Sequence, residues 1–255
     1  MTYGRRLLLA SHGEENRDPI VTNYLDSFLP QKNERIQCCG TTRANFCPEC
    51  LRLLAPTASD VPQCVREGSL KLPFKLHIIL DDRRNSATGL QALALLGKEQ
   101  VSLRDINRDS FVTSGGPGSN GRSTYVLFPS PDSVPLSSVN EISTLVVLDC
   151  KWTRTKPTTS LVSDLPRVHL SSPPNQSHYW KSHTAEQGCL STIEAIYYAA
   201  TEVDPENADL IHLLWIFARQ RASIQARGPW KDRIHLPYTE HGKEAMRAMR
   251  RQNKK

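Results

Sequence analysis

The chain has 255 residues, of which 38% are hydrophobic and 23% are charged, and its formal net charge is +6. This composition is that of a globular protein with a buried core, and it excludes an intrinsically disordered chain. No apolar run is long enough to span a bilayer, so we expect no membrane segment. The positive charge favours a polyanionic partner, without deciding between RNA, DNA and a membrane surface.

The amino-terminal part is divided by its cysteines. Residues 1–34 are polar and aperiodic, and the only element that we predict there is a short helix near residues 21–28. Residues 35–70 contain five of the seven cysteines, including a Cys-x-x-Cys at residues 47–50. An odd number of cysteines is atypical of the disulfide framework of a secreted protein. The pattern predicts a small cysteine knuckle in a reducing compartment.

Residues 71–230 alternate short apolar runs with amphipathic segments. The apolar runs are predicted to be buried strands, and they comprise residues 75–80, 125–128, 144–148 and 167–170. The segments read as helices are residues 87–96, 191–201 and 208–226, and residues 101–121 read as a polar connection. Strands that alternate with helices predict an α/β fold with a mainly parallel sheet flanked by helices. Residues 231–255 are predicted to be a basic carboxyl-terminal tail.

The residues that follow the 144–148 strand are candidates for function. In open parallel sheets, ligands bind beyond the carboxyl ends of the strands, which is where Asp149 emerges. Asp149 either meets a ligand there or caps the next turn, and its position leaves both open. Basic residues then surround one aromatic ring, a pattern that suits an RNA backbone with a displaced base, although a solvated basic loop is the alternative. These RNA-binding candidates are Lys151, Trp152, Arg154 and Lys156.

The start of the 191–201 helix carries a second signal. Ser191 followed by Glu194 is a capping box, in which each side chain satisfies a backbone N–H group. The same helix start offers N–H groups and partial positive charge to an anionic ligand. The two interpretations are compatible.

Several segments together resemble the DTW-domain family of tRNA-uridine aminocarboxypropyltransferases. The most specific are residues 149–152 (Asp-Cys-Lys-Trp) and residues 190–198 (Leu-Ser-Thr-Ile-Glu-Ala-Ile-Tyr-Tyr). Residues 127–131, 72–79 and 46–50 resemble the family's turn, first core strand and cysteine knuckle, so the resemblance covers roughly residues 35–226. The chain departs from the family pattern at four places, which read Asp81-Asp82, Ala87-Thr88, Ser130 and Lys151.

The resemblance implies a SPOUT-like fold whose knotted carboxyl-terminal half binds S-adenosylmethionine. It implies transfer of the cofactor's 3-amino-3-carboxypropyl group to N3 of a tRNA uridine, with Asp149 as the base or as a cofactor contact. The residues that it assigns to cofactor binding are Phe128, Pro129, Ser130, Leu190, Ser191, Thr192 and Glu194. A SPOUT-like RNA methyltransferase and a non-catalytic RNA-binding relative remain alternatives.

The knuckle is predicted to bind zinc through four thiolates. These are Cys38, Cys39, Cys47 and Cys50. Because adjacent cysteines rarely chelate one ion, the prediction requires a bend between the first two, or completion of the site by Cys64 or a histidine. We expect Cys150, Cys189 and the histidines at 169, 178, 183 and 212 to be structural. The basic cluster 247–255 favours a nuclear or cytoplasmic location, and the oligomeric state is not predicted.

Overall fold

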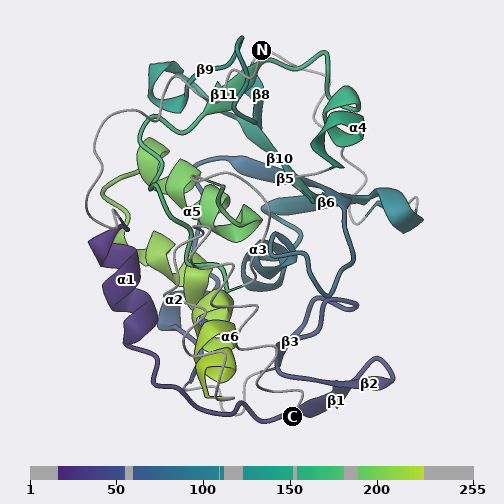
Figure 1. Ribbon diagram of the computed structural model, residues 1–255, viewed down its shortest axis with the longest axis vertical. Coiled ribbons are helices and arrows are strands. Elements are labelled where there is room, and N and C mark those ends of the chain that lie inside the picture. Colours follow the sequence, from purple (N-terminus) through teal and green to yellow (C-terminus); the bar gives the residue numbers. More distant parts are fainter. Residues whose placement is uncertain are drawn as a thin grey trace, which may run out of the picture.

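A seven-stranded sheet forms the centre of the molecule (Figure 1). The computed structural model describes residues 17–54, 60–108, 110–111, 123–151, 154–180 and 189–226. The strand order is β7–β6–β5–β10–β8–β11–β9, in which six neighbouring strands are parallel and β7 is antiparallel at one edge. The predicted α/β fold with a mainly parallel sheet is therefore confirmed.

The elements that position the sites have the following bounds. The strands are β1 (Ile36–Cys38), β2 (Thr41–Arg43), β3 (Asn45–Phe46), β4 (Leu53–Leu54), β5 (Lys75–Asp81), β6 (Val101–Asp105), β7 (Ser110–Phe111), β8 (Thr124–Leu127), β9 (Val134–Pro135), β10 (Thr144–Cys150) and β11 (Arg167–His169). The helices are α1 (Pro19–Asp26), α2 (Gln63–Arg66), α3 (Leu90–Leu96), α4 (Thr155–Ser160), α5 (Thr192–Val203) and α6 (Trp215–Gln225), and the 3-10 helices are η3 (Ile106–Arg108), η5 (Leu136–Ser138) and η7 (Ala208–Leu214).

The sheet is covered on both faces, and this explains the continuous apolar runs of its central strands. Leu76 and Ile78 of β5 and Leu145 and Val147 of β10 belong to the main core, together with α3, α5 and α6. On the other face, Ile79, Val126, Val146 and Val162 form a small cluster beside α4. Figure 1 shows α3, α5 and α6 gathered on one side of the sheet.

Two sequence predictions about elements were wrong. Residues 101–105 belong to a parallel strand, β6, and not to a polar connection. Val101 and Leu103 are buried while Arg104 is only partly buried, so the strand has the alternating pattern of a half-buried strand rather than a continuous apolar run.

The second wrong prediction is the single helix over residues 208–226. The segment divides into η7, a 3-10 helix, and α6. Three residues per turn place Leu210 and Leu213 one above the other, and both are fully buried.

The short amino-terminal helix is present as α1. The Asp18 carboxylate accepts the N–H of Ile20 at 2.8 Å and caps it. Val21 and Leu25 are buried in the main core, and Asp26 pairs with Arg221 of α6 at 2.8 Å. No helix within the described residues has both the length and the apolar character to cross a membrane. The expected basic tail lies outside the described residues.

Candidate functional site

Asp149 joins three segments at the carboxyl edge of the sheet. Its Oδ2 accepts the backbone N–H of Gly89 at 2.7 Å, and its Oδ1 accepts the Thr192 hydroxyl at 3.0 Å. The side chain is buried, with 5% exposure. Gly89 precedes α3 and Thr192 begins α5, so one carboxylate holds two helix starts against the end of β10.

Gly89 is a site residue that the sequence did not reveal. A Cβ atom at this position would lie 2.7 Å from Asp149 Oδ2 and 3.1 Å from Thr192 Cγ2. The neighbouring Thr88 hydroxyl accepts the N–H of Ile193 at 3.3 Å. The backbone before α3 therefore approaches Asp149 and α5 more closely than a side chain would allow. A glycine before an apolar helix carries no sequence signal for this approach.

The α5 start contains the predicted capping box. Glu194 is fully buried, and its Oε2 accepts the N–H of Ser191 at 2.9 Å. Glu194 also accepts the Ser177 hydroxyl at 2.6 Å and the N–H of His178 at 2.7 Å. These contacts hold residues 177–179 against the helix start. The predicted cofactor contacts of Leu190, Ser191, Thr192 and Glu194 stay predictions.

A second carboxylate occupies the same edge on the opposite face. Asp81 ends β5 and is buried, and it accepts the Thr158 hydroxyl at 3.0 Å. The Nη2 atom of Arg154 lies 3.7 Å from Asp81 Oδ1, whereas Thr158 donates to Oδ2. Burial raises the pKa of the neighbouring Cys150 thiol, Thr158 opposes this, and the charges of Asp149 and Asp81 add to it. The Cys150 thiol therefore stays neutral near pH 7.

Tyr179 is another residue that the sequence reading missed. Burial raises its pKa, and the charges of Asp149, Asp82 and Glu194 raise it further. Its ring stacks 6.4 Å from Phe217 of α6, measured between ring centroids. The phenol is thus a protonated hydrogen-bond donor in the field of three carboxylates.

The four knuckle thiols converge, as the zinc prediction requires. The sulfur atoms of Cys38, Cys39, Cys47 and Cys50 all lie within 4.8 Å of one another. Cys38 Sγ is 3.5 Å from Cys50 Sγ and 3.9 Å from Cys39 Sγ. In a tetrahedral zinc site with Zn–S bonds of about 2.3 Å, sulfur atoms are roughly 3.8 Å apart. The spacing therefore fits one zinc ion.

The bend between the adjacent cysteines comes from a hairpin turn. Cys38 pairs with Thr41 across β1 and β2, which leaves Cys39 and Gly40 as a two-residue loop. Their φ angles are +48° and +74°, as a type I′ hairpin turn requires. This left-handed turn lets both thiols face one point. Adjacent cysteines can thereby serve as one arm of the site.

The second arm is a tight turn that prepares a thiolate. Leu51, with φ +61°, donates its N–H to the carbonyl of Cys47 at 2.8 Å. Burial opposes ionisation of Cys47, but the backbone N–H groups of Cys50 and Glu49 outweigh it and lower the Cys47 pKa to about 7. A thiolate is the form that binds metal.

The family profile described as DTW domain matches residues 44–224, more than half of the chain. The chain belongs to the DTW-domain family. This family comprises the tRNA-uridine aminocarboxypropyltransferases, so the chain is a member of a family of tRNA-modifying enzymes. Searches among curated proteins and among solved structures return no significant match.

The matched DTW domain begins between the two arms of the knuckle. It includes Cys47 and Cys50 but not Cys38 and Cys39. It also includes the whole seven-stranded sheet and ends inside α6. The four-thiol cluster is therefore shared between the DTW domain and the hairpin that precedes it.

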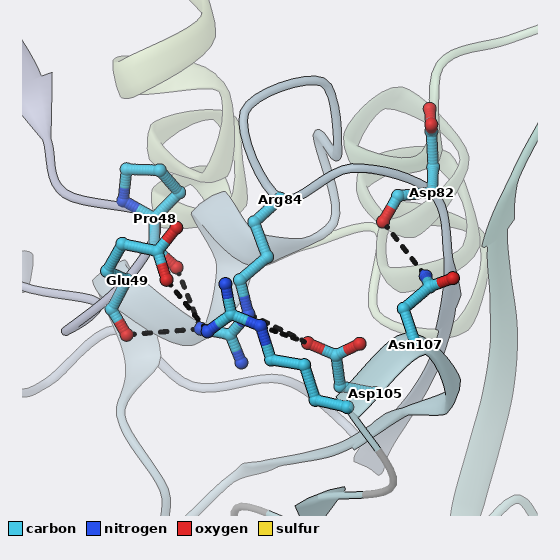
Figure 2. A network of polar contacts seen from close by, with 7 residues as sticks. Pro48, Glu49, Asp82, Arg84, Asp105 and Asn107 are labelled. Carbon is cyan, nitrogen blue, oxygen red and sulfur yellow. Dashed lines mark hydrogen bonds and ion pairs between the residues drawn. The ribbon is translucent and has the colours of Figure 1, made fainter.

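An arginine anchors the knuckle to the DTW sheet (Figure 2). Arg84 Nε lies 2.8 Å from Asp105 Oδ2 of β6, and Arg84 Nη1 donates to the carbonyls of Pro48 and Glu49 at 2.9 and 3.1 Å. Arg108 adds an ion pair with Glu49 at 2.8 Å. Arg84 belongs to the loop between β5 and Gly89. This loop therefore contacts both the turn at residues 47–51 and the carboxyl edge of the sheet at Asp149.

The remaining predicted residues lie around the same edge. Phe128 packs with the cluster on the α4 face, whereas Asp149 and Thr192 lie on the α5 face. Pro129 is exposed and the N–H of Ser130 donates to Ser133 Oγ at 3.0 Å. The exposed basic side chains are those of Lys151, Arg154 and Lys156. Trp152 lies outside the described residues.

Proposed function

We propose that this DTW-domain protein transfers the 3-amino-3-carboxypropyl group of S-adenosylmethionine to N3 of a tRNA uridine and releases methylthioadenosine. The observation that carries the proposal is the buried Asp149, held at the carboxyl edge of a DTW sheet by Gly89 and Thr192. When bound, S-adenosylmethionine supplies a carbon made electrophilic by its sulfonium group. The SPOUT-like knotted topology of the carboxyl-terminal half is part of this proposal.

The charge of the edge fits a cationic ligand. Asp81 ends β5 and Asp82 follows it, and Asp149, the last residue but one of β10, pairs with Leu80 in the parallel register. The sulfonium and the amino group of S-adenosylmethionine are both positive, and carboxylates nearby attract them. Thr192 already contacts Asp149, which places the α5 start beside this group. We therefore assign cofactor binding to this edge, together with the Phe128–Ser130 turn.

Asp149 is the candidate base. Uracil N3–H is a weak acid, and N3 becomes a good nucleophile only when a base removes the proton. Two hydrogen bonds fix the orientation of the Asp149 carboxylate before the substrate arrives. Such alignment contributes to the rate because it is complete before the reaction. The alternative role of Asp149 is to hold the cofactor's amino group.

The RNA is expected to approach over the exposed basic residues beside α4. Lys151 and Lys156 are exposed, and Arg154 is exposed while paired at long range with Asp81. Such side chains attract phosphates in a salt-dependent manner. Trp152 is proposed to stack on a base, and the four thiols are proposed to hold a structural zinc ion. A nuclear or cytoplasmic location is proposed from the basic tail.

Mass spectrometry of nucleosides tests the proposal. Unmodified tRNA is incubated with the purified chain and S-adenosylmethionine, and we expect aminocarboxypropyluridine together with methylthioadenosine. A methylated nucleoside together with S-adenosylhomocysteine would instead establish a methyltransferase. Unchanged tRNA that nevertheless binds the protein would indicate a non-catalytic relative, and transfer restored by Lys151→Thr would trace the loss to that position.

The Asp149→Asn variant tests the base. General-base catalysis contributes on the order of 100- to 10,000-fold, so we expect the transfer rate to fall by that range while cofactor affinity changes little. The Asn oxygen can still accept the N–H of Gly89, and the Asn amide group can donate to the Thr192 hydroxyl in place of accepting from it. Asp164→Asn is the matched control, because Asp164 is exposed and distant in the chain from this edge. Normal turnover by Asp149→Asn would remove Asp149 from the base role.

A further inference from the structure

We propose that Cys64, Asp209 and His212 form a second metal site that binds a divalent ion of the zinc class. The ligand atoms of these three side chains all lie within 4.8 Å of one another. None of the three belongs to the knuckle, which has four thiols without Cys64. The sequence predicts Cys64 as a possible additional ligand of the knuckle and His212 as a structural residue. The structure instead brings them together.

The local folds explain why these ligands meet. Asp209 and His212 are three residues apart on η7, and three residues make one turn of a 3-10 helix. Their side chains therefore point to the same side. Cys64 lies on α2, which is a single helical turn. The Cys64 carbonyl accepts the N–H groups of Ser69 and Leu70 at 2.9 and 3.0 Å. Two rigid short helices thus supply the three ligands.

The surroundings of His212 are those of a metal ligand. The Tyr24 hydroxyl lies 3.1 Å from His212 Nδ1, and the two rings make an edge contact with centroids 5.7 Å apart. Histidines that bind metals are commonly oriented by a hydrogen bond at the other ring nitrogen. Tyr24 belongs to α1, so a metal here would fasten α1 and α2 to η7.

The donor set indicates which ion binds. One sulfur, one nitrogen and one carboxylate oxygen are the ligands that zinc takes in proteins, whereas calcium and magnesium prefer oxygen alone. A thiolate and a carboxylate together balance the charge of a divalent ion. Cys64 is buried and Asp209 is exposed, so the site reaches from the core to the surface. A water molecule is the natural fourth ligand on the exposed side.

Counting bound zinc tests the site independently of any enzyme activity. The full-length reduced chain is dialysed against micromolar zinc, and bound metal is measured by elemental analysis. We expect two zinc ions per chain in the unmodified protein and one in each of Cys64→Ser and His212→Gln. Cys47→Ser should also retain one, because it removes the knuckle ion instead. Cys189→Ser, at a half-buried cysteine outside both clusters, should retain two.

The exposed Asp209 keeps the test decisive if the buried variants fail to fold. Asp209→Asn should fold. With cobalt as a spectroscopic probe, its affinity for the ion at the one-thiolate site should fall at least tenfold. The absorption of cobalt at the four-thiolate site should stay unchanged. One zinc per chain in the unmodified protein would overturn the proposal. A count of two that persists in Cys64→Ser and His212→Gln would overturn it equally.

Discussion

The cysteine knuckle and the Asp149 edge, which is the carboxyl edge of the sheet where Asp149 meets Gly89 and Thr192, are stabilised in different ways. The knuckle has only a small apolar cluster of Cys38, Cys47 and Leu54, and the backbone of three of its non-glycine residues has positive φ. The Asp149 edge rests on the main core, and its polar groups are held by hydrogen bonds to backbone and side chains. We therefore expect the knuckle to depend on a bound metal ion, whereas the edge is held by packing and hydrogen bonds.

The two regions are linked through one loop. Arg84 contacts the knuckle carbonyls and the buried Asp105, and the loop that contains it leads to Gly89. We therefore expect a loss of order in the knuckle to loosen the loop that holds Asp149. Variants in the knuckle, in the Arg84 link and at Gly89 therefore separate the two regions.

Loss of a knuckle ligand should have the largest effect. Structural zinc contributes on the order of 10 kcal/mol in isolated zinc fingers, so Cys47→Ser should lose one zinc ion and leave the knuckle unfolded. Limited proteolysis should then cut within residues 35–54 while the sheet stays protected. Cys150→Ser is the control, because Cys150 lies outside the four-thiol cluster. An unchanged proteolysis pattern in Cys47→Ser would mean that the knuckle folds without metal.

Arg84→Met breaks the link between the two regions. Removing one partner of a buried ion pair costs about 3–5 kcal/mol, and the side chains of Arg84 and Asp105 are 9% and 2% exposed. We expect this loss in urea unfolding, with faster hydrogen exchange at the Gly89 amide and an unchanged zinc count. Arg83→Met is the control, because Arg83 is the exposed neighbour. Equal rates of hydrogen exchange at the Gly89 amide in both variants would show that the knuckle and the Asp149 edge are independent.

Gly89→Ala tests the close approach at the edge alone. The added Cβ would lie 2.7 Å from Asp149 Oδ2, so we expect a loss of about 1–3 kcal/mol in stability. Shortening Asp149 to alanine removes the clashing oxygen. The cost of Gly89→Ala should therefore be smaller in the Asp149→Ala background, as a double-mutant cycle measures. Additive costs would place the strain elsewhere.

Replacement of His77, a residue of the sheet, should have the smallest effect, which is a change in how stability depends on pH. Burial, aided by Arg104, lowers the His77 pKa to about 4, and Nδ1 lies 2.6 Å from Ser102 Oγ. The unfolded chain, with a histidine pKa of about 6.5, binds more protons between pH 4 and 6.5, so stability is full above pH 6.5 and falls as pH falls. We expect His77→Gln to reduce the loss between pH 7 and pH 5 by about 1–2 kcal/mol. Identical pH slopes in urea unfolding would contradict this.

Local patterns in the sequence determined the fold class and part of the site. Apolar runs at residues 75–80 and 144–148 predicted β5 and β10, because a strand buried on both faces needs no polar alternation. The Ser191 and Glu194 spacing predicted the capping box, since both groups lie in one helical turn. The family resemblance also came from the sequence, and the match over residues 44–224 shows it.

Only the tertiary structure decided which distant residues meet. Gly89 and Thr192 reach Asp149 across 60 and 43 positions of the chain, and no local periodicity records such a contact. Cys64 is likewise far in sequence from Asp209 and His212, and it meets them only because the fold brings α2 and η7 together. The bend at Cys39 depends on the β1–β2 pairing that makes it a hairpin loop. Residue types and local spacing set the elements, whereas packing of those elements sets the sites.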